Sequence, residues 1–453
     1  MQPLPKEFEE QMKRLLGEAG FFAYLDALNQ PYTRALRVNL LLRPDGTPPC
    51  PIEGLGAPVP WAKGAYFVEG DARPGLSPLH EGGLFYMQEP SALTAVTALD
   101  PQPGERVLDL CAAPGGKSTQ IAALMAGRGL LCCNEPIPSR AQILSRNIER
   151  MGVRNAVVLS AMPDALAPHF PAFFDRILVD APCSGEGMFR RQPEARDEWD
   201  ADAPRRCADR QMEILTQAAK MLRPGGTMVY STCTFNDTEN EGVLKRFLAL
   251  HPEFSLVPFA LPGLPEAKDG YLHLYPHEMR GEGHFVSRLK KADGADEADA
   301  PVQAAPQRKA PARAAAKGKA PAPIALPDVF SDAFAPERLY TAGDALWMLP
   351  EGISIERLSG LRVLRTGLLL AHAEGKRSEP DHALAMALRP EEAARTANLT
   401  QTQALAYQAG ETLSLGDLPG GYTLLCCEGV SLGWGKQAGG LMKNHYPKGL
   451  RRR

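Results

Sequence analysis

The chain has 453 residues, 44% hydrophobic and 23% charged, and a formal net charge of -3. This length allows two or three domains with sizeable cores. No apolar run approaches the ~20 residues of a membrane span, and the charged, amphipathic start lacks the apolar segment of a signal peptide. Nine cysteines without a framework spacing indicate a reducing compartment. We therefore expect a cytoplasmic protein with no membrane segment; its net charge does not decide whether it binds nucleic acid.

Residues 1–75 are predicted to form an N-terminal module that begins with a helix. Apolar residues recur at helical spacing between positions 8 and 28. A strand-like run then carries Arg34, Arg37 and Asn39. Composition favours a solvated strand face for these three residues, and the alternative is a surface that contacts RNA phosphates.

Residues 76–291 are predicted to form an α/β domain around a largely parallel sheet. Short apolar runs alternate with helical segments, which is typical of parallel strands with crossover helices. Residues 82–91 are interpreted as a loop that enters a helix. The expected strands are residues 107–110, 130–134, 156–159, 174–179 and 227–229, followed by two closing strands within 270–291.

A glycine-containing loop follows the first expected strand and opens a helix. Residues 111–117 read Cys-Ala-Ala-Pro-Gly-Gly-Lys, and small residues let a ligand approach the backbone amides at the helix start. The loop is not a phosphate loop, because Cys111 stands where the first glycine would be needed. We predict a cofactor site here. Glu135, after the second strand, is expected to accept both hydroxyls of a ribose, and Asp164, after the third, is a candidate for contact with a base ring.

Two cysteines follow the fourth and fifth expected strands. Cys183 lies in Asp-Ala-Pro-Cys-Ser-Gly-Glu-Gly (180–187) and Cys233 in Tyr-Ser-Thr-Cys-Thr (230–234). A single buried cysteine is usually a small hydrophobe, but two at neighbouring strand ends beside Asp180 predict covalent chemistry on an unreactive carbon. A thiolate that adds to carbon 6 of cytosine makes carbon 5 nucleophilic toward a methyl donor. An acid must then act at ring nitrogen 3, and a base must remove the proton from carbon 5.

The remaining segments concern RNA contact. Residues 190–210 are rich in arginines and acids, and two interpretations remain open: a self-paired surface helix and an RNA-contacting face.

Residues 292–327 are almost entirely Ala, Pro, Gly and charged residues, so we expect a flexible linker. Residues 328–453 should form a small α+β or barrel-like module. Its basic tail from residue 433 carries Trp434, His445 and Tyr446, which we interpret as stacking rings of an RNA-contacting surface.

Three motifs together resemble the Sun-type RNA 5-methylcytosine methyltransferases. They are Asp-Leu-Cys-Ala-Ala-Pro-Gly-Gly-Lys (109–117), Asp-Ala-Pro-Cys-Ser-Gly-Glu-Gly (180–187) and Tyr-Ser-Thr-Cys-Thr-Phe (230–235). The resemblance extends to residues 34–39, 279–285 and the basic tail. It implies a Rossmann-like class I methyltransferase with a seven-stranded, mostly parallel sheet, an N-terminal RNA-binding module and a C-terminal PUA-like α+β module.

The same resemblance implies the roles of individual residues. Cys233 is the nucleophile, Cys183 assists release, and Asp180 serves both the ring and the cofactor. S-adenosylmethionine is the implied cofactor, with no metal, and its expected contacts are Cys111, Ala112, Ala113, Pro114, Gly115, Gly116, Lys117, Glu135, Arg140, Asp164 and Asp180. At one place the chain departs from the family, which has Asn or an acid close to the third strand end. Here Ser160-Ala-Met-Pro-Asp164 stands there, so the residue that meets the adenine stays open.

The predicted activity is methylation of carbon 5 of cytosine in RNA, with 16S rRNA of the small ribosomal subunit as substrate. A tRNA cytosine methyltransferase and a catalytically silent RNA-binding assembly factor are the alternatives. A DNA enzyme of this chemistry would use the cysteine of the Pro-Cys motif and would lack the Thr-Cys motif. We expect a monomer that binds RNA.

Overall fold

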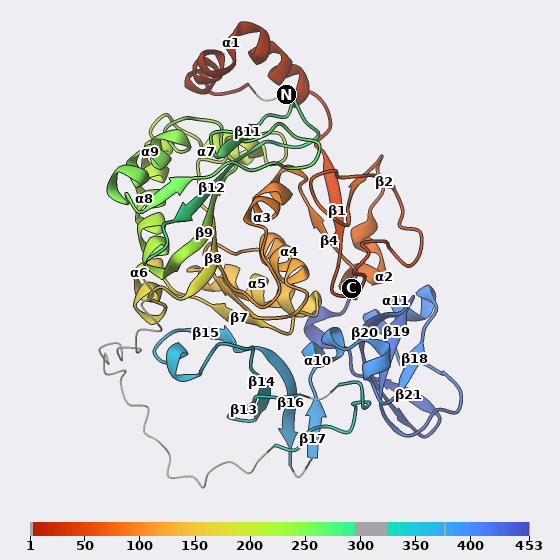
Figure 1. The fold of residues 1–453 in the computed structure, drawn as a ribbon. Coiled ribbons are helices and arrows are strands. Elements are labelled where there is room, and N and C mark those ends of the chain that lie inside the picture. The colour runs from red at the N-terminus through yellow and green to blue at the C-terminus, as the bar shows by residue number, and fades with distance from the viewer. Residues whose placement is uncertain (1–2, 295–323, 335, 376, 453) are drawn as a thin grey trace.

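The computed structural model describes residues 3–294, 324–334, 336–375 and 377–452. A central α/β layer is flanked by an N-terminal sheet on one side and by two C-terminal sheets below it (Figure 1). Residues 295–323 of the predicted linker lie outside the described residues. No helix in the described ranges is both long and apolar enough to cross a membrane.

The N-terminal part consists of a long helix and a four-stranded antiparallel sheet. Helix α1 (Lys6–Leu28) changes direction at Gly17, whose φ is 68°, and packs Phe8 on Phe189 of the α/β layer with ring centroids 4.9 Å apart. The sheet has the order β2-β3-β1-β4. Its elements are β1 (Arg34–Val38), β2 (Leu55–Pro58), β3 (Ala65–Val68), α2 (Pro78–Glu81) and β4 (Phe85–Gln88). Residues 85–88 were expected in a loop; they form the edge strand β4 because they pair with β1.

Both interpretations of the arginine-bearing strand are wrong for Arg37 and Asn39, which are each only 1% exposed. Arg37 Nη2 donates to Thr119 Oγ1 at 2.8 Å, and Asn39 Nδ2 donates to the carbonyls of Gly83 and Met151 at 2.9 and 3.0 Å. The cause is that β1 is an inner strand of a sheet packed against the α/β layer. Burial of such polar groups is tolerated because they are hydrogen-bonded. These two residues therefore join the N-terminal sheet to the α/β layer.

The central sheet has the order β10-β12-β9-β8-β5-β6-β7-β15, with β11 also paired to β12. Strands β5 to β9 run parallel, and β12 is antiparallel to β9. The bounds are β5 (Arg106–Asp109), β6 (Leu130–Asn134), β7 (Ala156–Leu159), β8 (Phe174–Asp180), β9 (Leu222–Thr232), β10 (Phe254–Leu256), β11 (Tyr271–Leu274), β12 (His284–Lys291) and β15 (Val363–Arg365).

The predicted α/β class is confirmed, but the sheet has nine strands where seven were expected. Strands β10 and β11 both pair with β12, along 289–291 and 284–287 respectively, so one edge position is shared by two short strands. Strand β15 comes from the C-terminal part and pairs antiparallel with β7. No local pattern in residues 76–291 indicates a strand donated from beyond the linker.

Helices cover both faces of this sheet, because its strands are apolar on both sides. Val107 belongs to one core with α3, α4 and α5, and its neighbour Leu108 belongs to the other with α6, α8 and α9. The helices are α3 (Thr94–Leu99), α4 (Gly116–Leu124), α5 (Pro138–Arg150), α6 (Pro163–Leu166), α7 (Glu194–Glu198), α8 (Ala203–Met221) and α9 (Glu241–Leu250).

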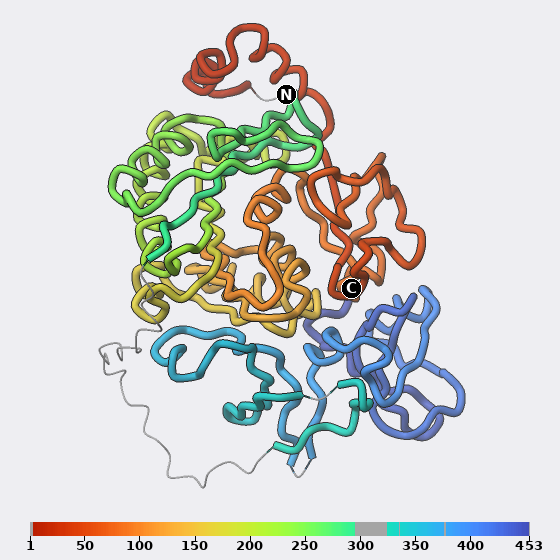
Figure 2. Tube along the Cα trace, in the orientation of Figure 1, coloured from red at the N-terminus to blue at the C-terminus, as the bar shows by residue number. Residues whose placement is uncertain are grey.

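The C-terminal part contains two four-stranded sheets. In Figure 2 its first segment lies below the α/β layer, and its last segment, in dark blue, lies below the N-terminal sheet. The first has β13 (Leu339–Ala342), β14 (Ala345–Met348), β16 (Leu368–Glu374) and β17 (Arg377–Pro380). The second has β18 (Thr396–Asn398), β19 (Gly421–Cys427), β20 (Val430–Ala438) and β21 (Leu441–Asn444), with helices α10 (His382–Ala387) and α11 (Gln401–Ala409).

The interpretation of Trp434 and Tyr446 as exposed stacking rings is wrong. They are 2% and 3% exposed and belong to the cores of the C-terminal part. The reason is that the tail is not an extension: residues 430–438 and 441–444 form two paired strands, and Trp434 and Tyr446 pack into the cores beside them. Its lysines 443 and 448 remain exposed.

Candidate active site

The loop after β5 is fixed by helix α5. Gly115 has a φ of 113°, a backbone conformation that favours glycine, and a Cβ there would approach Leu144 Cδ1 of helix α5 to 3.2 Å. Asn147 Nδ2 donates to the Pro114 carbonyl at 2.9 Å, and Arg140 Nη2 donates to the Ala113 carbonyl at 3.2 Å. The backbone of the predicted cofactor loop is thus held in one conformation before any ligand binds.

Two buried carboxylates lie beside this loop. Asp109 Oδ2 accepts a hydrogen bond from Ser118 Oγ at 2.6 Å, whereas Asp109 Oδ1 has no partner among the described residues. Burial raises the pKa of Asp109 to about 7. Glu135 is 2% exposed; its Oε1 accepts the Ile137 amide at 3.0 Å, and its Oε2 lies 3.5 Å from Arg140 Nη1. Both groups have acceptor capacity left for a polar ligand.

Asp164 lies apart from this pair. It is exposed in α6, and its Oδ1 accepts the amide of Ala165 at 2.8 Å. The strand end is shaped instead by the buried Asn134, whose Nδ2 donates to the carbonyls of Leu110 and Ala161 at 3.2 and 3.0 Å. The amide of Asn134 thus holds together the loops that follow β5 and β7.

The structure brings the two predicted cysteines together. Cys183 and Cys233 are free thiols, both half-buried, with their Sγ atoms 3.3 Å apart. They follow the adjacent parallel strands β8 and β9, which pair Asp180 with Ser231, and the Gly187 amide donates to the Cys233 carbonyl at 2.8 Å. The contact with Cys233 and burial raise the pKa of the Cys183 thiol.

Asp180 and Lys117 form an ion pair beside the thiols. Lys117 Nζ donates to Asp180 Oδ2 at 2.7 Å, and Ser231 Oγ donates to Asp180 Oδ1 at 2.8 Å. His284 Nε2 lies 3.5 Å from Asp180 Oδ1. Burial favours the neutral acid, but Lys117 and His284 outweigh it and hold the pKa of Asp180 well below its usual range.

Lys117 keeps its positive charge because the Asp180 carboxylate stabilises it. Burial alone would lower its pKa, but the Asp180 carboxylate, with a smaller contribution from Cys233, raises the pKa of Lys117 above its usual value. The site therefore holds an ionised carboxylate and an ammonium group in direct contact at neutral pH. The lysine of the predicted cofactor loop faces the acid at the end of β8.

Glu239 is the centre of a buried network under the cysteine loops, and the sequence interpretation missed it. Its Oε2 accepts the Ser184 amide at 3.0 Å and Gln211 Nε2 at 2.8 Å. Its Oε1 accepts Asn236 Nδ2 at 2.8 Å and the Ser184 hydroxyl. Burial raises the pKa of Glu239. This carboxylate fixes the residue that directly follows Cys183.

Glu186 connects the same loops from the other side. It is fully buried, its Oε2 accepts the amides of Phe235 and Asn236 at 2.8 and 3.1 Å, and its Oε1 accepts Asn236 Nδ2 at 3.0 Å and Gln11 Nε2 at 2.9 Å. Helix α1 thereby contributes to the site. Polar residues clustered around both cysteine motifs were the available signal, since buried polar side chains need partners.

The arginine-rich stretch 190–210 is only partly paired within itself. Arg206 pairs with Asp200 at 2.7 Å, as the self-paired interpretation expects. Arg190 instead forms a two-fold contact with Glu282, outside the stretch, at 2.8 and 2.7 Å. Arg191, Arg205 and Arg210 are exposed. Within the described residues, no group of three or more His, Cys, Asp or Glu side chains is placed to hold a metal ion.

Family models match nearly the whole chain. Residues 96–290 match the 16S rRNA methyltransferase RsmB/F model, and residues 4–90 match the N-terminal domain of 16S rRNA methyltransferase RsmF. Residues 327–388 match the RsmF rRNA methyltransferase first C-terminal domain, and residues 394–452 match the methyltransferase RsmF PUA domain. The two C-terminal sheets fall into these last two matches, one in each.

Relatives match over their full length. Ribosomal RNA small subunit methyltransferase F of Erwinia tasmaniensis is 34% identical over 98% of this chain and 96% of its own, and that of Escherichia coli O127:H6 is 33% identical with the same coverage. A solved methyltransferase homolog from Pyrococcus horikoshii is 30% identical, with a TM-score of 0.54 over 63% of this chain and 95% of its own. NSun6 from the same organism, solved with SFG, shares the fold at 23% identity, with a TM-score of 0.55 over 64% of this chain and 99% of its own.

Proposed function

The chain belongs to the RsmB/F family of 16S rRNA methyltransferases, and on this premise we propose that it methylates carbon 5 of cytosine in small-subunit rRNA, with S-adenosylmethionine as the methyl donor. The observation that carries the proposal is the pair of unbonded thiols, 3.3 Å apart, beside the Lys117–Asp180 ion pair. Two thiols and an ion pair supply the nucleophile, the base and the polar contacts that this substitution requires.

The residues around the loop after β5 fit the cofactor. S-adenosylmethionine, when bound, supplies a methyl group made electrophilic by its sulfonium. The loop 111–117 offers backbone groups, and Glu135 offers acceptors for ribose hydroxyls. Asp109 Oδ1 is a buried acceptor with no partner in the described ranges, which suits a site completed by a polar ligand. Arg140 acts by holding the loop through Ala113. Asp164 remains a candidate for the base ring.

Cys233 is the proposed nucleophile. Its thiolate adds to carbon 6 of the cytosine, a carbon–sulfur bond forms, and the electron pair of the ring double bond moves so that carbon 5 becomes nucleophilic. The target base must leave its stack to reach both thiols.

Cys183 is the proposed release residue. Its contact with Cys233 and its burial raise the pKa of the Cys183 thiol. Its Sγ lies 3.3 Å from Cys233 Sγ, so it is close to the carbon that Cys233 attacks. The Cys183 thiolate then takes the proton from methylated carbon 5, the ring double bond re-forms, and the carbon–sulfur bond to Cys233 breaks.

Asp180 acts as an ionised carboxylate, which refines its expected role as an acid. Because its pKa is held low, Asp180 accepts hydrogen bonds. It can therefore accept from the cytosine amino group or from ring nitrogen 3 when that nitrogen is protonated. At the same time it holds the Lys117 ammonium at 2.7 Å, and this fixes the positive charge near the reacting ring.

The flanking parts are proposed to bind the RNA. We assign residues 1–75 to an RNA-interaction module, 76–291 to the methyltransferase domain, 292–327 to a linker and 328–453 to a PUA-like RNA-binding region. The match of residues 394–452 to a PUA model supports the last assignment. The enzyme is proposed to act in the cytoplasm as a monomer.

The experiment is methyl transfer with defined RNA. Purified protein is incubated with methyl-labelled S-adenosylmethionine and with 16S rRNA, assembled small subunits or tRNA, and the nucleosides are separated by mass spectrometry. Labelled 5-methylcytidine from 16S rRNA or from subunits is expected, and the Cys233→Ala variant serves as the inactive control. Label only in tRNA would favour the tRNA alternative, and label in no RNA would favour a binding factor without catalysis.

A further inference from the structure

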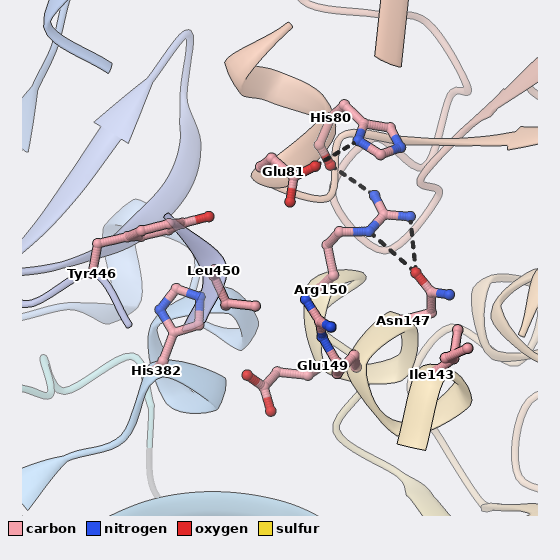
Figure 3. Close-up of a pocket in the computed structure, with 10 residues that line it drawn as sticks. His80, Glu81, Ile143, Asn147, Glu149, Arg150, His382, Tyr446 and Leu450 are labelled. Carbon is pink, nitrogen blue, oxygen red and sulfur yellow. Dashed lines mark hydrogen bonds and ion pairs between the residues drawn. The ribbon is translucent and has the colours of Figure 1, made fainter. Parts of the chain in front are cut away.

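A cavity of ≈ 230 Å³ lies at the junction of three parts of the chain. Figure 3 shows His80 and Glu81 of α2 on one side, the α5 residues Ile143, Asn147 and Arg150 on the next, and His382, Tyr446 and Leu450 of the C-terminal part opposite. We call this space the junction cavity. It is separate from the cysteines, which do not line it.

The walls of the junction cavity carry an excess of positive charge. Arg150 donates to the carbonyls of His80 and Phe85 at 2.7 and 3.2 Å and to Asn147 Oδ1 at 3.4 Å, all neutral groups. Arg146, also on its wall, is exposed and has no hydrogen bond or ion pair within the described parts of the chain. Of the two lining carboxylates, Glu149 pairs with Arg365 and only Glu81 faces Arg150, so positive charge is in excess at this wall.

The carboxylates of the cavity already interact with the protein. Glu149 forms an ion pair with Arg365. Glu81 lies 3.0 Å from His80 Nδ1, and this contact, together with the charges of Arg150 and Arg452, lowers the pKa of Glu81. Arg452 itself donates to the carbonyls of Leu76 and Ser77 at 2.5 and 2.9 Å. The electrostatics thus favour an anion.

The opposite wall is aromatic. The rings of His382 and Tyr446 meet edge to face, with centroids 5.4 Å apart and an interplanar angle of 86°. Burial lowers the pKa of His382 to about 4, so its imidazole is neutral at pH 7, and its Nδ1 has no partner among the described residues. Ile143 and Leu450 add apolar surface. A planar, partly polar group suits this wall.

We propose that the junction cavity binds one single-stranded nucleotide of the RNA substrate, with the base beside His382, Ile143 and Leu450 and the phosphate at Arg146. The volume is below the roughly 300–1,000 Å³ of sites that enclose drug-sized ligands, so the cavity takes one nucleotide at most and leaves part of it outside. Aromatic surface beside guanidinium groups is the usual chemistry for an unpaired nucleotide. This inference rests on the proposed function for its choice of RNA.

Helix α5 links the junction cavity to the active site. Asn147 lines the cavity and holds the cofactor loop through Pro114, and Arg140 holds it through Ala113 at the other end of the helix. At 1.5 Å per residue, Arg140 and Arg150 are separated by about 15 Å along the axis. The cavity therefore lies within about 15 Å, along α5, of the residue that holds the cofactor loop through Ala113.

The test uses Arg146→Ala and Arg146→Glu in the full chain. Arg146 is exposed, so neither change should disturb folding. Lys245→Ala is the control: it removes an exposed cation from α9, which lies at the other side of the central sheet (Figure 1). Binding of a fluorescent 16S rRNA fragment is measured across a series of salt concentrations, together with kcat and KM for methylation.

Arg146→Ala should weaken RNA binding about tenfold and reduce the salt slope by about one, as expected for one lost phosphate contact. Arg146→Glu should weaken RNA binding further. In both variants kcat at saturating RNA should not change. Ultraviolet cross-linking of the unmodified protein should attach a nucleotide to residues 143–150 or 446. Binding equal to that of Lys245→Ala, with no such cross-link, would overturn the proposal. Absence of 5-methylcytidine with the unmodified protein would refute the proposed function alone, since the binding difference is scored separately.

Discussion

Beneath Cys183 and Cys233, each carboxylate oxygen of Glu186 and Glu239 accepts at least two hydrogen bonds. Around the junction cavity, in contrast, Arg146 makes no hydrogen bond or ion pair within the described residues. A buried carboxylate whose oxygens are all occupied by hydrogen bonds holds a geometry, whereas a guanidinium group with unused donors has capacity for a ligand. The first region thus positions reacting groups, and the second is suited to hold a substrate at a distance from them.

The largest expected effect in the region around Cys183 and Cys233 comes from Asp180→Asn, which removes the ion pair with Lys117. An amide cannot compensate the Lys117 ammonium, and it presents a donor where acceptors are required. Methyl transfer should fall roughly 10²- to 10⁴-fold, the range typical for a group that assists proton movement. Single-turnover kinetics with 16S rRNA measure this, and circular dichroism confirms folding. A rate within threefold of the unmodified protein would show that the ion pair does not act in catalysis.

The second prediction concerns the stability cost of Asp109, whose Oδ1 has no partner among the described residues. Its pKa is raised to about 7, so the folded state holds this proton more tightly than the unfolded chain between pH 4 and 7. The free energy of unfolding should therefore fall as pH rises through that window, by at most about 4 kcal/mol. Urea unfolding at pH 5 and pH 7 should show this fall in the unmodified protein and a smaller one in Asp109→Asn. Equal pH dependence of the two proteins would contradict the raised pKa.

Glu239→Gln weakens the hydrogen-bond network beneath the cysteine loops and leaves both thiols in place. The new amide group would face the donors of Ser184 or Asn236, so the free energy of unfolding should drop by about 1–3 kcal/mol. Activity should fall with it, because the loop of Cys183 loses its anchor. Asp237→Asn is the matched control, since Asp237 is exposed on the neighbouring loop. Equal stability of the two variants would mean that the network does not hold the loop.

The smallest expected effects belong to the exposed lysines of the C-terminal part. Lys443→Ala and Lys448→Ala should each weaken RNA binding only a few-fold and reduce the salt slope by about one, if each contacts a phosphate. Substitution is preferable to deletion of the tail, because Trp434 and Tyr446 belong to its core. An unchanged slope in both variants would place the RNA path on the α5 side alone.

Sequence patterns predicted the elements whose structure is set by residues close together in the chain. Strands 130–134 and 156–159 were placed at their observed bounds, because continuous apolar runs between turns leave little ambiguity. The meeting of Cys183 and Cys233 also followed, since adjacent parallel strands end at one edge of a sheet.

Tertiary contacts decided the rest. Arg37 and Trp434 carry groups that suit RNA, yet both are buried, because their strands face a neighbouring domain or core. Strand β15 joins the central sheet from beyond the linker, and nothing in its three residues indicates its partner. The role of Glu239 depends on hydrogen bonds from Ser184 and Gln211, which lie far from it in the sequence. Pairing across long separations in sequence cannot be derived from one local window.

The division of labour between the two thiols is the central claim, and a denaturing gel tests it directly. Cys183→Ala and Cys233→Ala are each incubated with 16S rRNA and S-adenosylmethionine, and the mixtures are then denatured. Cys183→Ala should methylate once and remain as a covalent protein–RNA adduct, because Cys233 attacks and release fails. Cys233→Ala should form no adduct and no 5-methylcytidine. An adduct with Cys233→Ala and none with Cys183→Ala would contradict the assignment.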